Sequence, residues 1–158
     1  MTGQPLRIGV IGGGSCDAET AGVARQVGEL IAAAGAVLVC GGRGGVMQAA
    51  AEGARDAGGL TVGILPGEDP AAANPGIVVA IPTGLGDARN AVVVNASHAV
   101  IAIGGAWGTL SEAAFCIKKG VPLIRLRSDL PDLPVPTAAA PQEAVEWALR
   151  EGQRVRAG

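Results

Sequence analysis

Four glycine-rich stretches each follow a run of apolar residues, and charged side chains lie in or just after them. The stretches are 12-GGGS-15, 41-GGRGG-45, 84-GLGDARN-90 and 104-GGAWGT-109. Glycine lets backbone N–H groups approach phosphate oxygens closely, and a helix that starts after such a turn adds a partial positive charge. The charged residues that stand out at these turns are Arg43, Asp87, Arg89 and Glu112. The combination indicates a site for a phosphate-bearing ligand.

Several familiar nucleotide and metal motifs are absent from the sequence. A P-loop needs a lysine after its second glycine, but the only lysines are Lys118 and Lys119. The dinucleotide fingerprint G-x-G-x-x-G, begun at Gly12, has Asp17 in its last position. His98 is the only histidine, and neither H-E-x-x-H nor C-x-x-C occurs. The sequence therefore excludes a Walker-type site and an ordinary NAD dehydrogenase, and it predicts no metal site.

Short β-branched runs alternate with longer Ala-rich segments along the chain. The expected strands are Arg7–Ile11, Val37–Cys40, Thr61–Leu65, Ile77–Ile81, Ala99–Ile103 and Pro122–Leu126. The expected helices are Ala18–Ala34, Gly45–Ala57, Ala88–Ala96, Gly108–Lys119 and one near Pro141–Arg150, and three of them end at Gly35, Gly58 or Gly120. This order predicts a single Rossmann-like α/β domain over residues 1–158, with a mostly parallel sheet and helices on both of its faces. A Pro-rich connector, about residues 129–141, precedes the last helix.

Composition limits the class of protein. Of 158 residues, 49% are hydrophobic and 16% charged, with a formal net charge of −2, which favours a compact domain without a nucleic-acid partner. The longest apolar region, 91–107, is broken by polar residues and glycines, so no membrane span is expected. Three widely spaced cysteines indicate reduced thiols in a cytoplasmic protein. Cys40 and Cys116 are expected in the core, whereas Cys16, near a helix start, could have a lowered pKa.

Two runs, 41-GGRGGVM-47 and 104-GGAWGTLSE-112, together resemble the signatures of the Lonely Guy-like family, often labelled "possible lysine decarboxylase". The resemblance extends from about Ile8 to Leu126. Active members with this pattern cleave nucleoside 5′-monophosphates into free base and ribose 5-phosphate. The resemblance implies that Glu112 is the motif acid, Thr109 the phosphate-side hydroxyl and Arg89 the catalytic arginine.

The sequence also departs from that family pattern. Asn90 stands where the family has the lysine of an R-K pair, and Gly104, Ala106 and Gly86 replace a proline, a glycine and a methionine. The A-R-N and G-T-L-S-E runs look closer to a branch that includes molybdenum-cofactor carrier proteins, which bind a pterin phosphate. Lysine decarboxylation is rejected, because a pyridoxal phosphate enzyme needs a buried lysine and Lys118 and Lys119 adjoin each other near a helix end.

Three functions remain open. The first is a carrier that binds an AMP-like nucleotide or a molybdopterin-type ligand and requires no cofactor. The second is a nucleoside 5′-monophosphate phosphoribohydrolase, and the third is an interaction module with a vestigial site. Asn90 separates the first two, since Asn90→Lys is expected to produce or raise hydrolysis if the site is a disabled enzyme. Self-association into a dimer or larger assembly is expected from the small residues of the first two helices.

Three of the candidate site residues also have an alternative structural interpretation. Glu112 could complete a helix cap with Thr109, Arg89 could be a solvated helix residue, and Trp107 is either a surface residue or a stacking platform for a planar base. If the protein is an enzyme, Glu112 and Arg89 are the expected catalytic residues. The expected ligand contacts are Gly13, Gly14, Ser15, Gly42, Arg43, Gly44, Gly45, Asn90, Gly104, Gly105, Trp107, Gly108 and Thr109.

Overall fold

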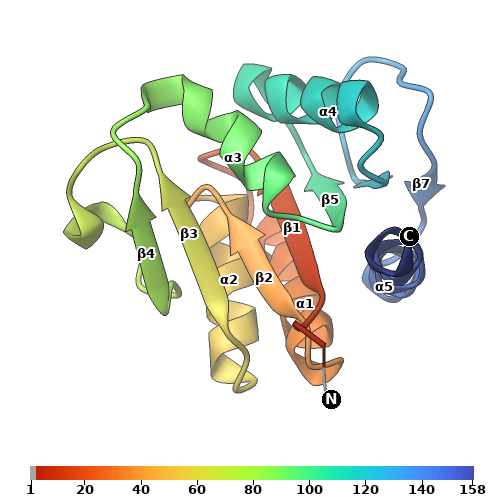
Figure 1. Ribbon diagram of the computed structural model, residues 1–158, viewed down its shortest axis with the longest axis horizontal. Coiled ribbons are helices and arrows are strands. Elements are labelled where there is room, and N and C mark those ends of the chain that lie inside the picture. The colour runs from red at the N-terminus through yellow and green to blue at the C-terminus, as the bar shows by residue number, and fades with distance from the viewer. Residues whose placement is uncertain (1–2) are drawn as a thin grey trace.

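A seven-stranded, all-parallel sheet forms the middle layer of the protein. The computed structural model describes residues 3–158, and its strands lie in the order β4-β3-β2-β1-β5-β6-β7 (Figure 1). The strands are β1 (Arg7–Gly12), β2 (Val37–Cys40), β3 (Thr61–Leu65), β4 (Val79–Pro82), β5 (Ala99–Ile103), β6 (Leu123–Leu126) and β7 (Thr137–Ala138). The expected Rossmann-like α/β fold is therefore confirmed.

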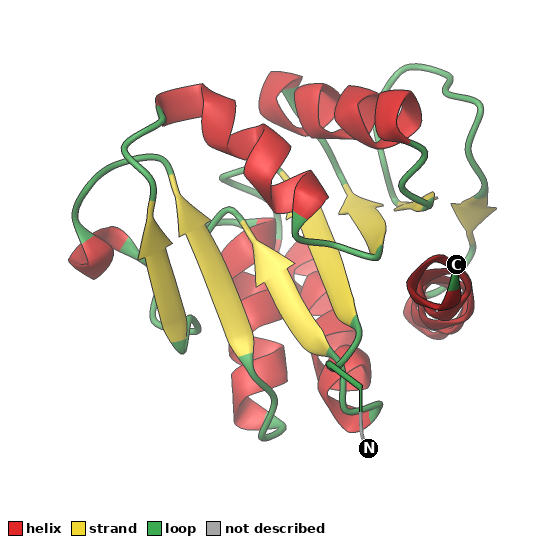
Figure 2. Cartoon of the chain, viewed as in Figure 1, coloured by secondary structure: helices red, strands yellow, loops and turns green. Residues whose placement is uncertain are grey.

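Helices cover both faces of this sheet (Figure 2). They are α1 (Ala18–Ala33), α2 (Val46–Asp56), α3 (Arg89–Asn95), α4 (Trp107–Lys119) and α5 (Pro141–Ala157), with short 3-10 turns η1 (Pro70–Ala72) and η2 (Gly86–Ala88). The side chains of α1, α2 and α5 share one buried apolar cluster with one face of the sheet. Those of α3 and α4 share a second cluster with the opposite face.

The chain reverses its direction of winding at β1. Strands β2, β3 and β4 follow one another on one side of β1, and the chain then crosses to place β5 on the other side, where Ile8 pairs with Ala99. The connections that leave β1 and β5 therefore diverge, and in open parallel sheets the crevice at such a switch point is where ligands bind. All five residues of β5 are buried, which explains its unbroken apolar sequence.

Most elements lie where the sequence predicts them, with three strands matching at both ends. The strand predicted at Ile77–Ile81 is displaced to Val79–Pro82, and α5 continues to Ala157 beyond the predicted Arg150. The short strand β7 was not predicted. It lies inside the Pro-rich connector, where the Arg125 N–H donates to the Pro136 carbonyl oxygen (2.9 Å), and two residues are too few to show a strand pattern.

The small residues of α1 and α2 pack against each other inside the protein. A side chain added at Gly28 would collide with the backbone of Ala50, and one added at Gly53 would collide with the backbone of Arg25. The close approach of these helices therefore uses the Ala- and Gly-rich faces that the sequence had suggested for self-association. Self-association itself stays a prediction, without this structural basis.

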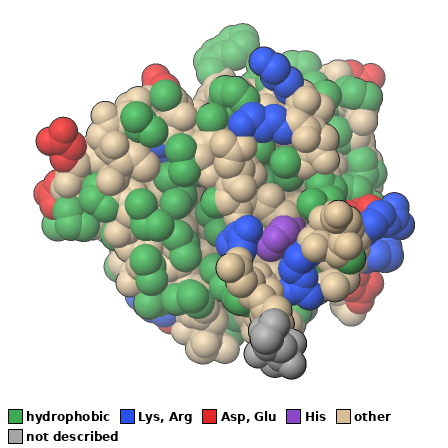
Figure 3. Space-filling model, viewed as in Figure 1, with side chains coloured by type: hydrophobic (Ala, Val, Ile, Leu, Met, Phe, Trp, Pro, Cys, Tyr) green, Lys and Arg blue, Asp and Glu red, His purple; other side chains and the backbone are tan. Residues whose placement is uncertain are grey.

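The outer part of the α3/α4 face is open. Hydrophobic side chains over β3 and β4 face the viewer in Figure 3, and Leu60, Val79 and Ile81 are each more than 40% exposed. Among residues 3–158, no helix is both long and apolar enough to cross a bilayer. The same part of the chain contains no group of three His, Cys, Asp or Glu side chains that could hold a metal ion.

Candidate functional site

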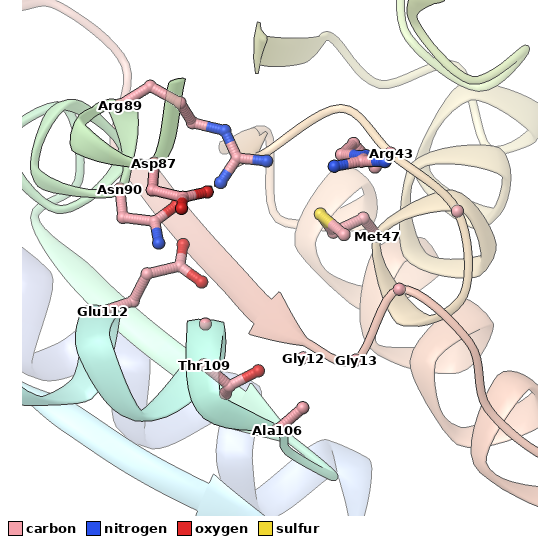
Figure 4. A pocket seen from close by; sticks show the side chains of 13 residues that line it. Gly12, Gly13, Arg43, Met47, Asp87, Arg89, Asn90, Ala106, Thr109 and Glu112 are labelled. Carbon is pink, nitrogen blue, oxygen red and sulfur yellow. The ribbon is translucent and has the colours of Figure 1, made fainter. Parts of the chain in front are cut away.

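A cavity of about 280 Å³ lies at the carboxyl end of the sheet, at the switch point beside β1 and β5. Side chains from α2, η2, α3 and α4 point into it (Figure 4). It is lined by Gly12, Gly13, Gly14, Arg43, Gly44, Met47, Asp87, Arg89, Asn90, Ala106, Gly108, Thr109 and Glu112. All four glycine-rich stretches thus contribute residues to one cavity.

Two of the glycine turns form one wall of the cavity by packing on each other. The Val46 N–H donates to the Gly13 carbonyl oxygen at 3.1 Å, which joins the start of α2 to the turn after β1. Gly45 has a φ of 62°, in the left-handed region, and a Cβ there would collide with the backbone of residues 13–15. Glycine is required at this position because both the backbone conformation and the close approach exclude a side chain.

Glu112 is a buried acid in the second turn of α4. The helix begins at Trp107 after the N-cap Ala106, whose methyl side chain cannot accept a hydrogen bond. Glu112 therefore does not cap the helix with Thr109, and the capping interpretation is wrong. Its side chain is 7% exposed, and burial raises the pKa of its carboxyl from 4.5 to about 8, against the attraction of Arg89. At pH 7 this carboxyl group is mostly neutral.

Arg89 is a buried cation in the same cavity. Only 8% of the residue is exposed, so the interpretation as a solvated helix residue is wrong. Its guanidinium donates to the Asn90 side-chain oxygen and, at 3.3 Å, to the Gly41 carbonyl oxygen. Its Nε–H finds no hydrogen-bond partner within residues 3–158. Burial lowers the pKa of Arg89, and Arg43 acts in the same direction, yet an arginine remains charged at neutral pH.

Polar groups also line the cavity near Arg89 and Glu112. Thr109 and Asn90 are 2% and 5% exposed, and the Asn90 amide nitrogen points toward the Glu112 carboxyl group (Figure 4). The first-turn N–H groups of α4 have no carbonyl within the helix to bond to, because every helix leaves such donors free. Two arginines, free backbone N–H groups and a neutral acid together make a cavity suited to an anion with a polar heterocycle.

The remaining predicted contacts lie outside this cavity. Ser15, Gly104, Gly105 and Trp107 line neighbouring hollows, whereas Gly42 and Gly45 shape the turn that carries Arg43. Conversely, Gly12, Met47, Asp87 and Ala106 line the cavity but were not among the predicted contacts. Asp87 could have been included, since it lies two residues before Arg89 in the same turn.

The cysteines and lysines do not line the cavity. Cys40 and Cys116 are buried, as predicted, and burial raises the pKa of each thiol to about 12. The pKa of Cys16 is raised by partial burial and by Asp17, so the suggested lowering is wrong. Lys118 and Lys119 are exposed in the last turn of α4, which agrees with the rejection of a buried Schiff-base lysine.

The fold and the cavity define a Rossmann-like protein with a cavity at the topological switch point of a parallel sheet, the place where open α/β sheets usually bind ligands. A family model matches residues 5–151, and the chain belongs to the SLOG cluster4 family.

Three relatives cover nearly the whole chain. An uncharacterised protein of Archaeoglobus fulgidus is 43% identical over 144 residues, which are 91% of this chain and 95% of that protein. The structure of the molybdenum cofactor binding protein of Rippkaea orientalis is similar with a TM-score of 0.88 and 39% identity, covering 94% of this chain and 98% of that one. A Moco carrier protein structure from Chlamydomonas reinhardtii has a TM-score of 0.85 and 31% identity, covering 96% and 99%.

Proposed function

We propose that this protein binds and carries a small phosphorylated heterocycle of the pterin-phosphate type, with a nucleoside monophosphate as the related ligand. The observation that carries this proposal is the buried Arg89 guanidinium, which lines the cavity and keeps an Nε–H without a partner among residues 3–158. A buried, unsatisfied cationic donor is costly unless an anion pairs with it. Similarity to two proteins described as binding or carrying the molybdenum cofactor supports the pterin.

The cavity offers separate groups for the two ends of such a ligand. The N-terminus of α4, with Gly108 and Thr109, and the guanidinium groups of Arg43 and Arg89 suit the phosphate. Glu112 suits a polar edge of the ring, because a neutral carboxyl group both donates and accepts a hydrogen bond. Because Glu112 is mostly neutral at pH 7, it does not repel an incoming anion.

The alternative function is a phosphoribohydrolase of the Lonely Guy type, in which Glu112 and Arg89 act on a nucleoside 5′-monophosphate. Both residues line one cavity, which favours this reading. Two features weigh against it. Stabilising an oxocarbenium-like ribose requires an ionised carboxylate, whereas the pKa of Glu112 is about 8, and Asn90 replaces the second positive charge of the R-K pair.

The deciding experiment measures release of adenine from AMP by the wild type and by Glu112→Gln, alongside melting temperatures with AMP, GMP and a pterin phosphate. A carrier is expected to release no adenine, while at least one phosphorylated ligand raises the melting temperature. Turnover that Glu112→Gln abolishes would instead establish the hydrolase. A melting temperature that no ligand changes would favour the third function, an interaction module with a vestigial site.

Arg89→Gln is expected to weaken binding of GMP or a pterin phosphate about 10- to 100-fold. The reason is the loss of a charge-assisted hydrogen bond to the phosphate, worth about 1.5–3 kcal/mol. Titration calorimetry measures this loss. The matched control is Arg154→Gln, which removes an equal charge from an arginine side chain that is 74% exposed on α5. Equal ligand affinity of the two variants would show that Arg89 does not contact the ligand.

Self-association, a cytoplasmic location and the absence of a nucleic-acid partner stay predictions from the sequence. Neither an AMP-like nucleotide nor the pterin is a required cofactor in this proposal. Each is the bound cargo.

A further inference from the structure

A second cavity of about 360 Å³ adjoins the first one across the start of α4. Ala106 lines both cavities, so they lie next to each other at this residue. The second cavity is lined by Gly105, Ala106, Trp107, Leu110, Asp129, Leu130 and Pro131. The function proposed above uses only the first cavity.

The walls of the second cavity suit a flat ring. Trp107 is 85% exposed, which is unusual for the largest apolar side chain, and Leu110, Leu130 and Pro131 add further apolar surface. A planar heterocycle stacks on an indole whatever its substituents, because every base has a π-face. Asp129, the only charged residue of this lining, is exposed, and its carboxyl group can accept hydrogen bonds from ribose hydroxyls.

The start of α4 lies between the two cavities. Trp107, its first residue, lines the second cavity, whereas Gly108 and Thr109 line the first. The free N–H groups of this first turn attract phosphate, and Ala106 supplies no side-chain acceptor for them. Phosphate groups bound there would have one cavity on each side.

We propose that the ligand is a dinucleotide, with two flat rings joined through a pyrophosphate. One ring occupies the cavity of Glu112 and Arg89, the pyrophosphate lies on the N-terminus of α4, and the second ring stacks on Trp107. This inference rests on the proposed function, because it assigns the phosphate to the same helix start. It extends the ligand class from a monophosphate to a pyrophosphate-linked pair of ring systems.

The test uses guanosine compounds, because guanine has the same 2-amino-4-oxopyrimidine edge as a pterin. GMP and P1,P2-di(guanosine-5′) pyrophosphate are titrated into a Trp147→Phe variant, in which Trp107 is the only tryptophan. The dinucleotide is expected to quench Trp107 emission. It is also expected to bind about tenfold tighter than GMP, because stacking of its second base on an aromatic side chain adds about that much affinity. Calorimetry on Trp107→Ala is expected to bring this affinity ratio to about one, with Trp107→Phe intermediate.

The outcomes separate this inference from the proposed function. Binding of GMP with no gain for the dinucleotide, or a gain that survives Trp107→Ala, overturns the second-ring site and leaves the carrier proposal standing. If neither compound binds, the inference falls; the carrier proposal falls with it only when AMP and a pterin phosphate also leave the melting temperature unchanged. Trp107→Ala should keep the wild-type melting temperature, since the indole is exposed, so loss of affinity would not reflect unfolding.

Discussion

Glu112→Gln is expected to stabilise the fold, by an amount that grows as the pH rises from 4.5 to about 8. Burial raises the pKa of this carboxyl in the folded state, so the native state holds a proton that the unfolded state has lost within this window. The free energy of unfolding of the wild type therefore falls as the pH rises through it. Glutamine has no proton to lose, and the difference should reach about 3–5 kcal/mol above pH 8.

Urea unfolding of both proteins at pH 5 and pH 8.5 measures this difference. Glu146→Gln is the matched control, because Glu146 is exposed on α5 and its replacement should leave the pH dependence unchanged. Parallel pH profiles for the wild type and Glu112→Gln would show that Glu112 ionises as an ordinary surface acid does. The proposed role of a neutral Glu112 beside a bound anion would then lose its basis.

A fold that retains such a costly group implies a use for it. A buried acid with a strongly raised pKa that lines a cavity close to a buried arginine is typical of a functional site. The ligand would offset part of the cost, since a ring edge that bonds to Glu112 satisfies a polar group that otherwise lies in a poorly hydrated place. Stability and binding therefore depend on the same carboxyl group.

The sequence predicts the sheet well because its central strands are buried on both faces. Val37–Cys40, Thr61–Leu65 and Ala99–Ile103 are short, mostly apolar runs, and a glycine or a proline directly follows each of them, which marks where the strand ends. β7 could not be predicted, because two residues held by pairing with β6 have no pattern of their own. Its position depends on a contact between distant segments, which local sequence does not contain.

In the site too, features that depend on local sequence were predicted, whereas features that depend on three-dimensional packing were not. The glycine turns correctly indicated the end of the sheet at which the cavity lies, and Arg89 and Glu112 both line it. The sequence could not separate glycines that face the cavity from those that pack turn on turn, such as Gly45. The sequence T-L-S-E has the form of a capping box and suggested that Thr109 caps the helix. This was wrong, because α4 begins at Trp107. The helix start is set by the extended Ala106, and this places Glu112 in the second turn.

Gly28→Ala is expected to destabilise the protein by about 3 kcal/mol or more, one of the largest effects of any single methyl group in this fold. Gly28 is buried in α1, and its added Cβ would lie closer than 3.0 Å to the backbone of Ala50 in α2. Backbone cannot move aside as a side-chain end can, so the two helices must separate. Thermal unfolding should show a melting temperature about 6–12 °C below that of the wild type.

Gly22→Ala in the same helix is the matched control. Gly22 is exposed with no atom within 4 Å of its added Cβ, so alanine should stabilise α1 by up to about 1 kcal/mol. Equal effects of the two substitutions would mean that α1 and α2 are not in close contact at Gly28. Because α2 begins at the glycine turn that carries Arg43, forcing it away from α1 should also displace that turn from Gly13. Gly28→Ala is therefore expected to lower ligand affinity from outside the cavity, which links the helix packing to the site.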